Sequence, residues 1–132
     1  LKEKHIQLFW EESDPDVPVI GDENRLKQVF INLIVNSIEA VMYDGVIEIT
    51  MNVHHDDGYV EVSVTDDGYG IPGEVMKKIF DPFFSTKAGK KNTGLGLSIC
   101  QHIIESHQGI ITCSSDEKTT FNVRFPLVEK VA

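Results

Sequence analysis

Two stretches of this chain carry glycines where they could bind a phosphorylated ligand. The first, NTGLGL, runs directly into SICQHIIESH, whose apolar residues recur at helical spacing. The start of a helix offers unpaired amides and a positive dipole to an anion, and glycine lets a phosphate approach the backbone. A tightly packed helix start without a ligand would account for the same pattern. The candidate residues of this stretch are Thr93, Gly94, Leu95, Gly96 and Leu97.

The second stretch is the acidic turn DDGYGIP, which follows a predicted strand. Asp66 could accept a hydrogen bond from the exocyclic amine of a base. Gly68 and Gly70 would let the backbone pass beneath that base, next to Ile71. The alternative is an Asx turn, in which Asp66 or Asp67 caps its own backbone, and the spacing alone somewhat favours it. Together the two stretches predict a nucleotide site.

Two asparagines four residues apart lie on the long helix predicted over residues 23–42. Asn32 and Asn36 would project from the same side of this helix, beside its apolar stripe. Their amide oxygens could meet Mg²⁺ and phosphates, because hard cations prefer oxygen ligands. Buried amides that find partners within the protein are the alternative, which the residues alone favour.

Other nucleotide and metal motifs are excluded. Gly68, Gly70 and Gly73 match GxGxxG, but the helix expected after them is too short for the crossover of at least ~10 residues that parallel strands need. Neither a GxxxxGK[ST] loop nor a protein-kinase glycine loop occurs. The five histidines share no metal-ligand spacing.

A single α/β domain covering residues 1–132 is expected to position these residues. The predicted strands cover residues 5–12, 17–22, 46–55, 59–67, 109–115 and 119–127, and the predicted helices cover 23–42, 73–80 and 94–107. The long helix would bury a stripe of Leu26, Val29, Phe30, Leu33, Ile34, Ile38 and Val41. This order of elements favours a two-layer α/β sandwich with a mixed, largely antiparallel sheet and three helices.

The net charge of −9 disfavours nucleic acid as a partner, because no general basic face is available to neutralise phosphates. One segment is nevertheless rich in lysine, and it could attract an anion or simply keep a loop solvated; it contains Lys77, Lys78, Lys87, Lys90 and Lys91. Cys100 and Cys113 are isolated and are expected to be buried, reduced thiols. No apolar run reaches the ~20 residues of a membrane span, so a soluble, cytoplasmic piece of a longer protein is expected.

Four patches, in one order, resemble the N, G1, F and G2 boxes of sensor histidine kinases: QVFINLIVNSIEAV, DDGYGIP, FDPFFSTK and NTGLGLSI. The resemblance covers almost the whole chain, from GDENRLKQ to TTFNVRFPL. It implies the catalytic and ATP-binding domain of the GHKL superfamily, with its Bergerat fold. Two residues depart from the usual pattern, since Asn92 and Lys118 stand where glycine is common.

The resemblance implies that two of these boxes hold the phosphates of ATP. Asn36 would coordinate Mg²⁺, and Asn32 would stand beside it near the phosphates. Residues 73–92 would form an ATP lid from which Lys87, or the lysines that follow it, reaches a phosphate. The amides of the NTGLGL stretch would also bind phosphate. The aromatic residues of the lid, Phe80, Phe83 and Phe84, would anchor it or dock on a partner domain.

The resemblance also implies that the acidic turn holds adenine. Asp66 would accept a hydrogen bond from the adenine amine, in a pocket shaped by Gly68, Gly70 and Ile71. Thr119 matches the threonine that lies near adenine, directly or through water.

Asn32 distinguishes two branches of this superfamily. Members that hydrolyse ATP have a glutamate there, which activates water, and an amide cannot accept that proton. The resemblance therefore implies a protein histidine kinase that transfers the γ-phosphoryl group of ATP to a histidine on a separate dimerisation domain. The alternatives are a GHKL ATPase module, a serine kinase of the anti-sigma type, and a degenerate nucleotide-binding domain that serves for docking.

The partners of such a domain follow from the same resemblance. The usual HE[LIF]xxP phosphoacceptor pattern is absent from the chain. The phosphoacceptor domain of the same parent is therefore expected upstream of Leu1, and a response regulator is expected downstream. The isolated domain would be a monomer without membrane contact, and the parent would be a homodimer, either cytoplasmic or anchored in the membrane.

Overall fold

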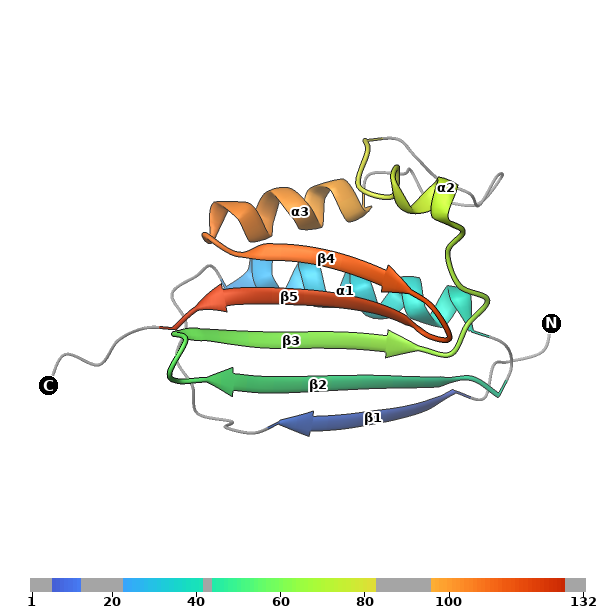
Figure 1. Ribbon diagram of the computed structural model, residues 1–132, viewed down its shortest axis with the longest axis horizontal. Helices are drawn as coiled ribbons and strands as arrows, with labels where there is room; N and C mark the ends of the chain where they lie inside the picture. The colour runs from blue at the N-terminus through green and yellow to red at the C-terminus, as the bar shows by residue number, and fades with distance from the viewer. Residues whose placement is uncertain (1–5, 13–22, 42–43, 83–95, 128–132) are drawn as a thin grey trace, which may run out of the picture.

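The computed structural model describes residues 6–12, 23–41, 44–82 and 96–127, which form a sheet covered by helices on one face (Figure 1). The strands are β1 (Gln7–Glu12), β2 (Val46–His54), β3 (Tyr59–Asp66), β4 (Ile110–Ser115) and β5 (Thr119–Pro126). The described helices are α1 (Glu23–Ala40), α2 (Gly73–Met76) and α3 (Gly96–Ser106). The strand order is β1-β2-β3-β5-β4, with β1 parallel to β2 and the other neighbours antiparallel. The predicted two-layer sandwich with a mixed, largely antiparallel sheet is therefore confirmed.

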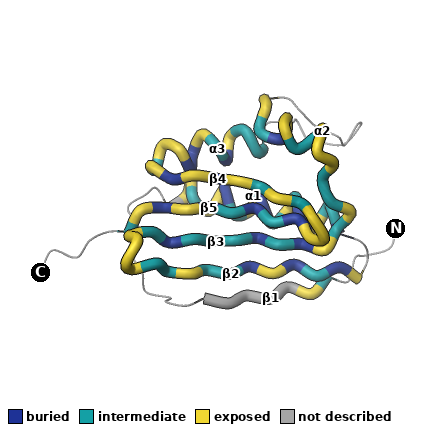
Figure 2. The backbone as a smooth tube through the Cα atoms, viewed as in Figure 1, coloured by how far each residue is buried: buried dark blue, intermediate teal, exposed yellow. Residues whose placement is uncertain are grey.

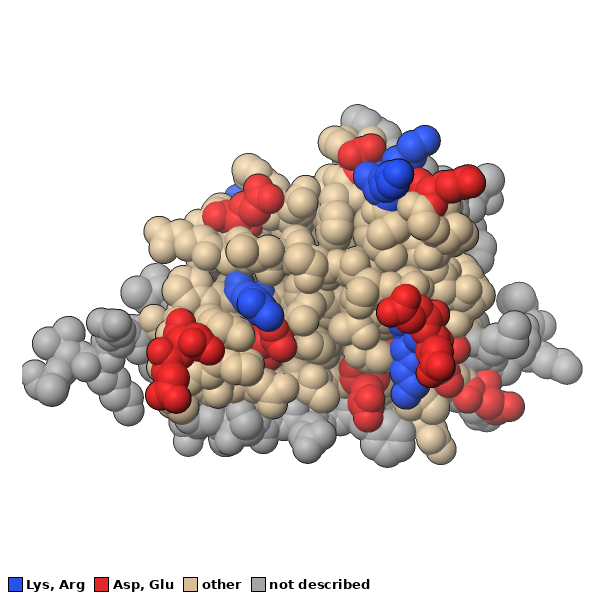
Figure 3. All heavy atoms as spheres, viewed as in Figure 1, with Lys and Arg blue, Asp and Glu red and all other residues tan. Residues whose placement is uncertain are grey.

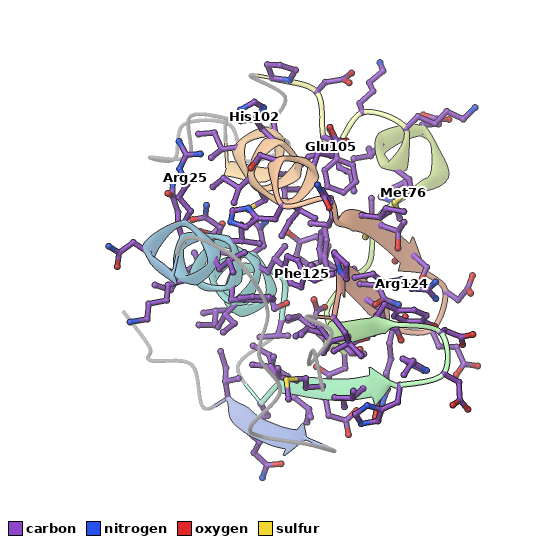
Figure 4. The ribbon with its side chains drawn as sticks, turned by 90° about the vertical axis from the view of Figure 1, so that its left-hand side faces the viewer. Arg25, Met76, His102, Glu105, Arg124 and Phe125 are labelled. Atoms are coloured by element: carbon purple, nitrogen blue, oxygen red, sulfur yellow. The ribbon has the colours of Figure 1, made fainter. Side chains whose placement is uncertain are left out.

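Side chains alternate between the two faces of the sheet. Phe125 points between the sheet and the helices, whereas its neighbour Arg124 points away from them (Figure 4). Along β5 every second residue from Thr119 to Phe125 is buried, which is the period of a strand covered on one face. Asp66, the last residue of β3, pairs with Thr119 in the register. Both side chains are buried and so belong to the helix-covered face.

The hydrophobic core lies between the sheet and helices α1 and α3 (Figure 2). Val29 and Leu33 of α1 are fully buried, as are Cys100 and Ile104 of α3. Burying each large aliphatic side chain contributes about 1.5–3 kcal/mol. This packing fixes the face of α1 that meets the end of β3.

The open face of the sheet is polar. The hydroxyls of Thr65 and Thr120 lie 3.0 Å apart, and Arg124 Nε donates to Glu61 Oε2 over 2.7 Å. On the side of the molecule shown in Figure 3, the described basic and acidic side chains are interspersed and do not form one basic patch.

Two sequence-based predictions differ from the structure. Ile38 is 38% exposed and does not join the buried stripe of α1, because it shares the outer side of the helix with Ile31 and Val35. The short helix expected over residues 73–80 is α-helical only to Met76 and continues as turns. Backbone hydrogen bonds from Lys78 and Asp81 reach back three residues, and the proline after Asp81 disfavours further helix.

Some predictions fall outside the described residues. These are the strand expected over residues 17–22 and the part of the lid with Lys87, Lys90, Lys91, Phe83 and Phe84. The remaining strands and the helices over 23–42 and 94–107 are confirmed with small differences at their ends. Both cysteines are free, as expected, although Cys113 is only half-buried.

Candidate nucleotide site

Asp66 closes β3 with a buried carboxylate. Only 2% of its surface is exposed, and its Oδ1 accepts a hydrogen bond from the backbone N–H of Gly68 over 2.9 Å. The Asx turn considered from the sequence is therefore present. Burial raises the pKa of Asp66, and the Gly68 bond partly opposes this rise. A carboxylate offers about four acceptor sites, so this turn leaves capacity for another donor.

Helix α1 packs directly against this turn. A Cβ on Gly68 would lie 2.7 Å from the carbonyl carbon of Ala40, and the N–H of Tyr69 donates to the Ala40 oxygen over 3.3 Å. Glycine is therefore required at position 68 by a close backbone approach. Asp67 holds the other side of the turn, since its Oδ1 accepts from the N–H of Val46 over 2.8 Å.

Ser37 lies beside Asp66 with a buried hydroxyl. Its side chain is 1% exposed, and it is near enough to the carboxylate to favour the charged form of Asp66. It nevertheless makes no well-formed hydrogen bond within the described part of the chain. The Asp66 carboxylate is the neighbouring acceptor that this hydroxyl can approach.

Strands β4 and β5 contact the acidic turn from the other side. The Oγ of Ser115 accepts from the N–H of Ile71 over 2.9 Å and lies 2.9 Å from Oγ1 of Thr119. Thr119 is 4% exposed. Gly70 has φ of +81°, a left-handed conformation that favours glycine, and a Cβ there would lie 3.2 Å from Ser115 Oγ. The structure thus brings Asp66, Gly68, Gly70, Ile71 and Thr119 together.

Asn32 is fixed by a sulfur contact between α1 and α3. Cys100 Sγ donates to the Val29 carbonyl oxygen at 3.8 Å, and Asn32 Nδ2 donates to the same sulfur at 3.6 Å. Because the thiol proton is directed at Val29, the amide nitrogen faces the sulfur and the amide oxygen Oδ1 faces away. Burial raises the pKa of Cys100, which keeps this thiol protonated. Asn36, one turn further along α1, is half-buried.

The phosphate-binding stretch is described only from Gly96 onward. Gly96 and Leu97 open α3 and are half-buried, while Thr93, Gly94 and Leu95 lie outside the described residues, as does Lys87. A Cβ on Gly96 would meet no described atom within 4 Å. Packing against the described residues therefore does not explain the glycine at this position.

Sequence reasoning missed Ser37, Ser115 and the contact between Cys100 and Asn32. Ser115 could have been found by pairing the strands GIITCSS and TTFNVRF in register, which sets it opposite Thr119. Ser37 interrupts an apolar stripe, and a polar residue in such a stripe calls for a partner. The sulfur contact joins residues 68 positions apart, and no local signal indicates it.

Residues 21–129 match the family described as histidine kinase-, DNA gyrase B- and HSP90-like ATPase. The chain belongs to this family. It is 45% identical over 108 residues to sporulation kinase A of Bacillus subtilis, covering 80% of this chain and 17% of that protein. It is 38% identical over 126 residues to the sensor histidine kinase ZraS of Escherichia coli, covering 94% of this chain and 26% of ZraS. The chain thus spans about a quarter or less of these two relatives.

Solved structures of histidine kinases also resemble this chain. The nucleotide-free catalytic domain of the histidine kinase ThkA superposes with a TM-score of 0.81 at 42% identity, covering 92% of this chain and 78% of that one. ThkA in complex with the response regulator TrrA gives 0.78 at 39% identity, with 93% and 34% covered. Full-length ShkA in complex with AMPPNP gives 0.81 at 26% identity, with 96% and 27% covered. The resemblance to histidine kinase catalytic domains is confirmed.

Two further observations concern the described residues. None of their helices is long and apolar enough to cross a membrane. They also contain no group of three or more His, Cys, Asp and Glu side chains arranged to hold a metal ion.

Proposed function

We propose that this domain binds ATP with Mg²⁺ and transfers the γ-phosphoryl group to a histidine on a separate dimerisation domain of the same parent protein. The observation that carries the proposal is the buried carboxylate of Asp66 at the end of β3, beside the close approach of Gly68 to α1. The carboxylate would accept a hydrogen bond from the adenine amine. The buried hydroxyl of Ser37 adds a second polar group beside this carboxylate.

The amides of α1 fit the phosphate end of the nucleotide. Asn36 would hold Mg²⁺ through its oxygen, which is a hard ligand of the kind this ion prefers. Asn32 would support the phosphates with Oδ1, because Nδ2 is directed at Cys100. When bound, Mg²⁺ would neutralise charge on the phosphates. Lys87, the stretch from Thr93 to Leu97 and the lid of residues 73–92 complete the proposed site.

Transfer rather than hydrolysis is supported by the chemistry of Asn32. An amide cannot remove a proton from water, and the sulfur contact holds it in place between the two helices. The γ-phosphoryl group would therefore await a histidine that attacks in line with the leaving oxygen. The family also contains ATPases, and a glutamate at this position would have favoured that alternative.

The proposed partners are the phosphoacceptor domain of the parent and a downstream response regulator. The ThkA complex with its response regulator supports the second partner. A homodimeric parent would bring its phosphoacceptor helices within reach of this domain, which by itself would be a monomer. A cytoplasmic location follows from the proposed use of ATP.

The test is phosphoryl transfer to the phosphoacceptor domain of the parent, a helical domain that is produced separately. With γ-³²P-ATP and Mg²⁺, label is expected on that domain in an acid-labile, base-stable form, as a phosphohistidine requires. A helical domain with its acceptor histidine replaced by glutamine serves as the control and should stay unlabelled. Release of inorganic phosphate without labelling would contradict the proposal and support an ATPase.

A further inference from the structure

Ser115, the last residue of β4, connects the base-binding turn to Thr119 through two hydrogen bonds. Its Oγ accepts from Ile71 N–H and lies 2.9 Å from Thr119 Oγ1. Ser115 and Thr119 are partners in the β4–β5 register, and Thr119 and Asp66 are partners in the β3–β5 register. One row across three strands therefore carries two hydroxyls and a carboxylate on the helix-covered face.

Chemistry constrains which hydroxyl donates within this row. A hydroxyl has one proton and two acceptor sites, and Ser115 already uses one acceptor site for Ile71. The negative carboxylate of Asp66 lies on the other side of Thr119 in the register, so it favours a Thr119 O–H that points away from Ser115 to the side where the base is proposed to bind. Ser115 then donates its hydroxyl proton to Thr119 Oγ1. The resulting direction runs from Ile71 N–H through Ser115 to Thr119 and on toward the proposed base site.

We propose that Ser115 is a positioning residue that directs the Thr119 hydroxyl proton into the pocket and so makes the site selective for adenine. This inference rests on the proposed binding of ATP. Asp66 supplies an acceptor and Thr119 a donor, side by side. The 6-amino group and N1 of adenine form the complementary donor and acceptor, directly or through one water. Guanine has the opposite pattern, an acceptor O6 and a donor N1–H. It would place an acceptor against Asp66 and a donor against Thr119.

An atom-specific ligand separates this role from simple support of the turn. The wild-type chain, Ser115→Ala and Ser115→Cys are titrated with ATP and with 1-deaza-ATP, in which a C–H group replaces N1. Cysteine fills nearly the same space but is a weak hydrogen-bond partner. Ser114→Ala is the matched control, because Ser114 is an exposed neighbour on the same strand. Thermal melting of each variant establishes that it is folded.

The wild type is expected to bind ATP more tightly than 1-deaza-ATP, and both Ser115 variants should lose about threefold to tenfold of that preference. Thr119→Val should lose the same preference, and combining it with Ser115→Ala should add little, because the two residues act in one chain. Ser114→Ala should leave the preference unchanged. If Ser115→Ala does not fold, Ser115→Cys is judged by the same criterion.

Three results would overturn the inference. Equal weakening of both ligands would reduce Ser115 to a support of the turn, and unchanged binding of both would remove it from the site. A wild type that binds neither ligand would overturn the proposed function itself. That last result differs from the first two, in which the wild type still binds ATP.

Discussion

Replacing Asp66 by asparagine should weaken ATP binding while leaving the turn intact. Asparagine has the same shape, and its oxygen can still accept from Gly68 N–H, so the Asx turn survives. The amide nitrogen would then occupy the place of an acceptor and face the adenine amine with a second donor. The loss of a hydrogen bond to a charged acceptor costs about 1.5–3 kcal/mol, which is roughly tenfold to 150-fold in the dissociation constant.

The assay is calorimetric titration of ATP into the wild type, Asp66→Asn and Asp67→Asn. Asp67→Asn is the matched control, because it removes the same charge one residue away, and Asp67 is exposed and bonded to Val46 N–H instead. Its dissociation constant should stay close to that of the wild type. Equal dissociation constants for Asp66→Asn and the wild type would falsify the assignment of Asp66 to the base pocket.

The same variant should change how stability depends on pH. Burial raises the pKa of Asp66 in the folded chain above its ordinary value of 3.8. Between the ordinary pKa and the raised pKa of the folded chain, the folded state therefore binds more protons than the unfolded state. The free energy of unfolding falls as pH rises through this window. In urea unfolding, Asp66→Asn should lack the pH dependence that Asp66 gives to the free energy of unfolding. At pH values above this window it should be more stable than the wild type. A variant with the pH profile of the wild type would contradict this.

Three further predictions concern other residues. Asn36→Ala should abolish phosphoryl transfer to the helical domain and the Mg²⁺ dependence of ATP binding, with little change in melting temperature; normal transfer would make Asn36 structural. Gly68→Ala should lower the free energy of unfolding by about 1–3 kcal/mol because its Cβ would clash with Ala40, whereas Gly73→Ala, with open space around it, should not; equal urea midpoints for both would refute the close approach. Burial, aided by the charge of Asp66, raises the pKa of Cys113 to about 12, so iodoacetamide at pH 8 should alkylate it slowly in the folded chain and rapidly in urea; mass spectrometry showing fast labelling of the folded chain would contradict this.

The sequence predicted the parts of this fold that depend on local periodicity. Alternation along TTFNVRFPL and helical spacing along α1 follow from covering one face of a sheet, so both elements appear where expected. Ile38 shows the limit of this reasoning. A spacing of three and four residues marks more than one side of α1, and only the position of the sheet decides which side is buried.

The candidate site was predictable where a motif lies within one turn of chain. Asp66 and Gly68 are two residues apart, and the structure contains the Asx turn that the spacing favoured, with a buried Asp66 carboxylate. The contacts of Ser115 with Ile71 and of Cys100 with Asn32 join distant segments. They depend on strand register and helix packing, which periodicity does not specify.

The most direct test of the central claim is a calorimetric titration of the chain with ATP, with and without Mg²⁺, followed by an assay of the same cell contents for released phosphate. A domain that holds ATP for a histidine acceptor should bind it, bind it more tightly with Mg²⁺, and release negligible phosphate. Rapid release would contradict the role given to Asn32 and indicate an ATPase. Absence of binding would contradict the nucleotide site and indicate a domain that serves only for docking.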